Sequence, residues 1–151
     1  MKSKFVQLSV ALKLVVIWFF LLALSSFWRF GIDIQTKRVL DIGPLLGGII
    51  EWGLAIGLIN RSNESRTWAV FIVFLSSLVS FFGLAIAVFE DPNSTKGFHF
   101  QIQTPMTHVT HAQEIAFVGA FLILNVAVLF ILMRPSTKAF FTSQTNLKDK
   151  Q

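Results

Sequence analysis

Two stretches without a charged side chain, residues 68–89 and 115–133, constrain the fold of this chain more than any other feature. Each has about the length that a helix needs to cross the roughly 30 Å hydrocarbon core of a bilayer. Two further apolar runs, at about residues 6–28 and 42–60, complete a set of four. Because lipid offers no hydrogen bonds to the backbone, spanning runs fold as helices. The sequence therefore predicts an all-α membrane protein built as a four-transmembrane-helix bundle.

The first run needs a charged residue to reach a full span. Residues 14–28 are uncharged but too short, so we expect the span to begin near residue 6, with Lys13 snorkelling to the interface. A cleaved signal peptide is the alternative, because Lys2 and Lys4 form a basic start and residues 23–25 offer a small-residue cleavage site. The run continues past that site to Trp28, which favours a span.

The distribution of basic residues predicts the sidedness. Four spans place both termini on one side, with residues 29–41 and 90–114 as outer loops and 136–151 as a cytoplasmic polar tail after a 1–135 membrane domain. Nine basic residues then lie inside and four outside, which favours an N-in/C-in topology. The inner set is Lys2, Lys4, Lys13, Arg61, Arg66, Arg134, Lys138, Lys148 and Lys150, and the outer set is Arg29, Lys37, Arg38 and Lys96.

The two outer loops carry short patterns typical of strands. Residues 32–35 and 98–103 both alternate apolar and polar side chains. Both loops lie on the same side in the predicted topology, so the strands could pair as a small extracytoplasmic β-element. Irregular loops are the alternative.

One carboxylate, Glu51, lies inside the second apolar run. A charged group at the bilayer centre costs about 2.5–3.5 kcal/mol on insertion scales, so it is a functional hypothesis by default. At 100° per residue Glu51 shares a helix face with Gly47 and Ala55, which indicates that it points into the bundle. We expect helix packing at small residues of these spans, namely Gly47, Gly48, Gly53, Ala55, Gly57 and Gly83.

Three polar residues of the later spans are candidate partners of Glu51. Ser76 and Ser80 lie near mid-membrane in the third span, and Asn125 lies in the fourth. Together with Glu51 they form a hypothetical ligand or proton site; the alternative is a structural, largely protonated Glu51 that ties helices together. Asn125 also lies opposite a stripe of small residues, which indicates that one face of the fourth helix contacts another chain. That stripe comprises Ala116, Ala120 and Ala127.

A metal site is the weaker chemical hypothesis. His108, His111 and Glu114 are spaced by three, so on a helix they would share a face and could hold zinc with an open position. Ordinary loop histidines are the alternative. The chain has no cysteine, which excludes thiolate ligands, and no motif predicts a cofactor.

The layout resembles that of small, uncharacterised bacterial inner-membrane proteins with four spans. The residues that carry the resemblance are 57–61, 66–69 and 133–135 with Phe140. It implies a location in the bacterial cytoplasmic membrane and no activity. The net charge of +5 does not indicate nucleic-acid binding, because the basic residues flank apolar runs.

Three classes of function follow. The first is a non-enzymatic membrane protein that acts through protein–protein contacts in the bilayer, as an accessory subunit, assembly factor or immunity-type protein. Its partners would be membrane lipid and another membrane protein or a second copy. The second is a small oligomeric transporter, channel or lipid-binding protein that uses Glu51. An enzyme acting through the outer histidines ranks last.

Overall fold

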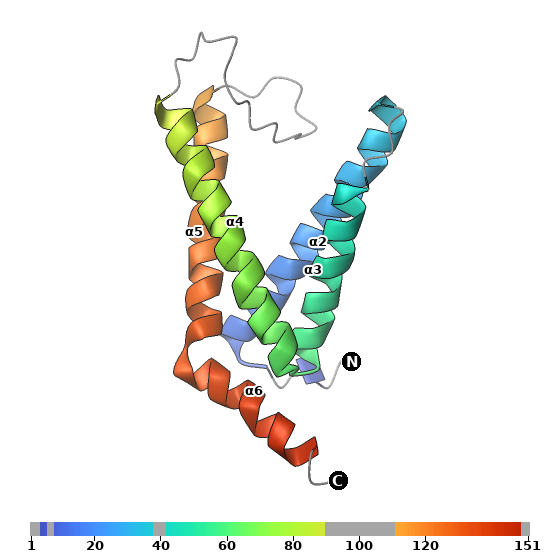
Figure 1. Ribbon diagram of the computed structural model, residues 1–151, viewed down its shortest axis with the longest axis vertical. Coiled ribbons are helices and arrows are strands. Elements are labelled where there is room, and N and C mark those ends of the chain that lie inside the picture. Colours follow the sequence, from blue (N-terminus) through green and yellow to red (C-terminus); the bar gives the residue numbers. More distant parts are fainter. Residues whose placement is uncertain (1–3, 6–7, 38–41, 90–110, 149–151) are drawn as a thin grey trace. The chain divides into compact units, whose positions relative to one another are not determined.

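The computed structural model describes residues 4–5, 8–37, 42–89 and 111–148, and its regular elements are helices (Figure 1). They are α2 (Val10–Lys37), α3 (Gly43–Ile59), α4 (Asn63–Phe89), α5 (His111–Met133) and α6 (Pro135–Lys148). Helices α2, α4 and α5 are each long and apolar enough to span a bilayer, whereas α3 is a shorter apolar helix of 17 residues. The described part of the chain is therefore all-α, and its three long apolar helices indicate an integral membrane protein.

Helix α2 corrects one sequence prediction. Residues 32–35, predicted as a strand or loop, are helical, because α2 continues past Trp28 to Lys37. Only Gly31 weakens this stretch, and no proline interrupts it. Extending an existing helix adds one hydrogen bond per residue fixed, whereas a strand needs a partner. The other predicted strand, at residues 98–103, lies outside the described residues.

The described residues belong to two compact units. Those within 1–70 and 130–151 form the first, and those within 71–129 form the second. In the first unit α2 and α3 run side by side (Figure 1). Its core combines side chains of every helix in the unit: Leu12, Val15, Val16, Phe19 and Ala23 of α2, Leu54, Ala55 and Leu58 of α3, Ala69 of α4, Leu132 of α5 and Phe141 of α6.

The turn between α3 and α4 is a Schellman motif followed by a helix cap. The N–H of Arg61 donates to the carbonyl of Leu58 (3.1 Å) and the N–H of Ser62 to that of Gly57 (2.9 Å). Arg61 has the left-handed backbone that this motif requires, with φ of 59°. The Ser62 hydroxyl then accepts from the N–H of Ser65 (3.2 Å), which caps α4. These bonds fix a tight connection between the two helices.

Helix α6 occupies most of the predicted polar tail. Pro135 follows α5 and takes the first helical position of α6, where its missing N–H is not needed. Phe141 is fully buried and Thr137 nearly so, which packs α6 against the rest of the first unit. Arg66 Nη1 donates to the carbonyl of Leu132 (3.2 Å), which satisfies an unpaired group in the last turn of α5.

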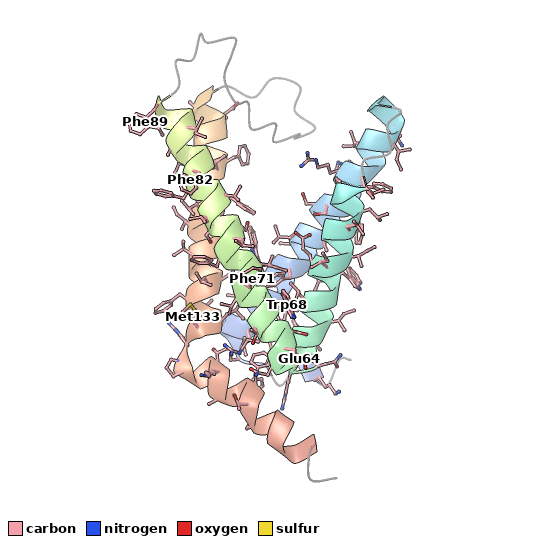
Figure 2. All side chains as sticks on the ribbon, viewed as in Figure 1. Glu64, Trp68, Phe71, Phe82, Phe89 and Met133 are labelled. Atoms are coloured by element: carbon pink, nitrogen blue, oxygen red, sulfur yellow. The ribbon has the colours of Figure 1, made fainter. Side chains whose placement is uncertain are left out.

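The second unit pairs the remaining length of α4 with that of α5. Its buried positions on α4 recur every three or four residues, at Val73, Ser77, Ser80 and Gly83. Large apolar side chains cover the outside of α4, including Phe82 and Phe89, which are 57% and 89% exposed (Figure 2). Small and polar residues inside with aromatic residues outside is the pattern expected where lipid is the solvent.

Candidate functional site

Glu51 lies on the face of α3 that packs against α2. The same face carries Gly47, Gly48 and Ala55, and Ala55 is fully buried. At Gly48 an added Cβ would lie 2.7 Å from the ring of Phe27, so only glycine leaves room for that ring. The small residues thus bring the α3 backbone close to α2 and carry Glu51 into the contact.

The carboxylate of Glu51 has a partner on α2. The hydroxyl of Ser26 donates to Glu51 Oε2 at 2.9 Å. Interhelical hydrogen bonds of this kind contribute about 0.6 kcal/mol on average in membranes and up to about 1.7 kcal/mol. Glu51 stays half-buried, so its second oxygen is available to a proton, water or another polar group.

The contact between the two helices is antiparallel. Phe20 meets Trp52 edge to face, with ring centroids 4.8 Å apart, and Phe27 meets Gly48. The later residue of α2 therefore contacts the earlier residue of α3, as expected for antiparallel helices. The hydrogen bond from Ser26 to Glu51 lies between these two aromatic contacts. The packed rings on either side hold the hydroxyl and the carboxylate at one level.

A second polar contact lies within the second unit. Asn125 is 1% exposed, and its side-chain nitrogen donates to Ser76 Oγ at 3.2 Å. Ser80 Oγ donates to the backbone carbonyl of Ser76 at 2.8 Å. Ser77, which sequence reasoning did not single out, donates to the carbonyl of Val73 in the same way. Buried polar groups in lipid are thereby hydrogen-bonded, and the Asn125 contact ties α4 to α5.

The predicted four-residue site is thus divided between the two units. In the second unit Ser76 bonds to Asn125 through its hydroxyl and to Ser80 through its backbone carbonyl, whereas Glu51 bonds to Ser26 in the first. The grouping of all four stays a prediction.

The predicted packing glycines have different surroundings. A Cβ added at Gly47 would lie 3.9 Å from the Ser26 hydroxyl, which is ordinary contact. Gly57 packs against Ser65 at the start of α4. Gly83 is buried on α4. Gly53 is exposed, and a Cβ there would meet no described atom within 4 Å, so packing at Gly53 has no support within the described chain.

The side chains of the predicted metal site are not among those that the structure describes. His108 lies outside the described residues, and His111 and Glu114 lie in the first turn of α5 without described side chains. Among the described residues no group of three His, Asp or Glu side chains could hold a metal ion. The zinc site stays a prediction.

Ser26 is the site residue that sequence reasoning missed. A serine within an apolar run carries no marked signal of its own. The position of Ser26 relative to Glu51 is the signal that could have found it. The two residues lie at equal sequence distance from the midpoint between residues 38 and 39. Two consecutive helices that pack antiparallel place such residues at the same depth.

No family model, curated protein or solved structure matches this chain. Its function is therefore inferred from the helices and their contacts. The candidate polar groups are the half-buried carboxyl of Glu51 with the hydroxyl of Ser26, and the separate pair of Asn125 and Ser76. Both pairs tie neighbouring helices together.

Proposed function

We propose that the protein is a non-enzymatic integral membrane protein that acts through lateral contacts in the bilayer, with another membrane protein or a second copy. It would be an accessory subunit, assembly factor or immunity-type protein of the bacterial cytoplasmic membrane. All four apolar helices would cross the membrane, with both termini in the cytoplasm. At about 1.5 Å per residue, α3 rises about 26 Å, so it would cross with local thinning of the bilayer.

The observation that carries the proposal is the face of α5 opposite Asn125. Asn125 is used within the chain, whereas Ala116, Ala120 and Ala127 are exposed. Gly119, beside them, has open space around its Cβ position. Small residues at helical spacing let a second backbone approach closely, which is how helices associate where lipid removes the hydrophobic driving force.

Site-specific photocrosslinking in membranes tests the proposal. A photoreactive residue at Ala120 should give a protein adduct of discrete mass, either a dimer or a complex with one partner. The same group at Leu21, 54% exposed on α2, serves as the matched control and should label lipid. Ala116→Ile combined with Ala127→Ile should abolish the Ala120 adduct by blocking close approach. Lipid adducts alone at Ala120 would contradict lateral contact through this face.

The alternative is a small oligomeric transporter, channel or lipid-binding protein that uses Glu51. The half-buried position of this carboxyl in the middle of an apolar helix favours it. Glu51→Gln separates the two functions, because glutamine keeps an oxygen acceptor for Ser26 but cannot exchange a proton. Loss of proton-coupled flux in vesicles with intact folding would support transport, and full retention of function would support a structural Glu51.

A further inference from the structure

The junction of α5 and α6 carries an exposed surface that is half apolar and half cationic. Its apolar members are Phe130 and Met133 in the last turn of α5, which are 63% and 61% exposed. Its cationic members are Arg134 and Lys138, both exposed. We call these four residues the junction surface.

The two cations of the junction surface are neighbours. The N–H of Lys138 donates to the carbonyl of Arg134 at 3.0 Å, so the residues are one helical turn apart. Side chains at this spacing lie side by side, and like charges there repel. Within the described part of the chain neither cation forms an ion pair. An anion between them would relieve that repulsion.

Two further cations belong to the same end of the first unit. Arg66 reaches the last turn of α5 through its bond to the Leu132 carbonyl. The Arg61 guanidinium lies 4.7 Å from the ring centroid of Phe140 on α6. These contacts join the α3–α4 turn to the α5–α6 junction, so Arg61 and Arg66 add two positive charges to those of Arg134 and Lys138. Glu64, in the first turn of α4, offsets one of them. The summed charge attracts anions beyond any one pair.

The apolar half selects the kind of anion. The stretch of α5 suited to span a bilayer ends at Met133, so Phe130 and Met133 lie at the edge of the hydrocarbon and Arg134 follows at headgroup level. The Arg134 guanidinium lies 4.9 Å from the ring centroid of Phe130, which directs the charge along the apolar side chains. A soluble anion would contact the cationic half alone, whereas a single anionic phospholipid contacts both halves.

We propose that the junction surface binds one anionic phospholipid, its phosphate between Arg134 and Lys138 and an acyl chain along Phe130 and Met133. Basic residues at the end of a spanning helix recognise anionic headgroups in this way, and each contributes roughly a 5-fold gain in affinity. Phe130 adjoins the small-residue face of α5, because it lies one helical turn after Ala127. The two cations lie beyond the end of α5, so variants of Arg134 and Lys138 test the lipid assignment without altering that face.

Native mass spectrometry of the full chain in neutral detergent, titrated with phosphatidylglycerol, tests the proposal. Wild type should bind one phosphatidylglycerol more tightly than phosphatidylcholine with the same acyl chains. Arg134→Gln combined with Lys138→Gln should weaken binding roughly 25-fold, whereas Arg29→Gln, an exposed cation on α2, should not. Arg134→Lys keeps the charge and should retain binding, which separates a lost site from a lost fold.

Three results would overturn the lipid assignment. The first is equal binding by wild type and the double glutamine variant. The second is displacement of the lipid by an equal concentration of glycerol 3-phosphate, which would show that the surface takes a phosphate without an acyl chain. The third is a second copy of the protein, rather than lipid, released when the double variant is made.

Discussion

The hydroxyl of Ser26 on α2 donates a 2.9 Å hydrogen bond to the carboxylate of Glu51 on α3. A charged residue inside an apolar run is tolerated when another element of the protein supplies its partner. Here the partner comes from the adjacent helix, and the small residues around Glu51 bring the two backbones close enough for the bond.

Replacing Ser26 by alanine should destabilise the fold by about 0.6–1.7 kcal/mol, because Glu51 loses its interhelical donor. The measurement is the free energy of unfolding in mixed micelles titrated with a denaturing detergent. Ser25→Ala is the matched control, since Ser25 is exposed on the same helix. Equal stability of the two variants would show that the Ser26 bond contributes nothing.

Replacing Gly48 by alanine should destabilise by about 1–3 kcal/mol, because the new methyl group would overlap the ring of Phe27. Gly53→Ala should instead stabilise by about 0.5–1 kcal/mol, because that position is open and alanine favours a helix. Phe27→Leu should recover part of the Gly48→Ala loss. Equal stability of the two alanine variants would contradict the close contact between Gly48 and Phe27.

Replacing Arg61 by glycine has two opposed effects. Glycine relieves the left-handed backbone of the Schellman motif, a gain of about 1 kcal/mol, but removes the guanidinium from Phe140. In a Phe140→Leu background the contact is already lost. The stabilisation by Arg61→Gly should therefore be larger there than in the wild type, and the difference should be about 0.5–1 kcal/mol. A double-mutant cycle on thermal unfolding measures the difference. A coupling energy of zero would contradict the Arg61–Phe140 contact.

The Asn125–Ser76 pair should show a coupling energy of about 0.6 kcal/mol, with about 1.7 kcal/mol as the upper limit. The cycle uses Asn125→Leu and Ser76→Ala, alone and combined. Ser80→Ala is the control, because its hydroxyl bonds to a backbone carbonyl of its own helix. Coupling of Asn125 to Ser80 rather than to Ser76 would reverse the assignment of the pair.

The apolar runs predicted the positions of the apolar helices because length and absence of charge are what lipid selects. The second run, at residues 42–60, corresponds closely to α3, and the fourth ends at Met133 as predicted. The first run was placed too early, because α2 begins at Val10 and its stretch suited to span a bilayer continues to Ile32. The shared face of Gly47, Glu51 and Ala55 also followed from helical periodicity. What it packs against did not, because periodicity fixes which side chains share a face and not which helix covers it.

The remaining differences have local causes. Alternation at residues 32–35 is typical of a strand, but a helix already in progress extended through it to Lys37. Helix α6 carries little hydrophobic signal in its sequence and depends on the burial of Phe141 and Thr137. Propagation of α2 decided the first segment and tertiary burial decided the second, and a local pattern reports neither.

The sidedness of the two ends of the chain tests the central claim, that α3 crosses the membrane as a fourth span. Because the chain has no cysteine, single cysteines at Lys4, Gln35 and Ser143, all exposed, can be labelled with a membrane-impermeant maleimide in intact and in permeabilised cells. The account predicts labelling of Gln35→Cys in intact cells, and of Lys4→Cys and Ser143→Cys only after permeabilisation. Labelling of Lys4→Cys and Ser143→Cys from opposite sides would contradict it.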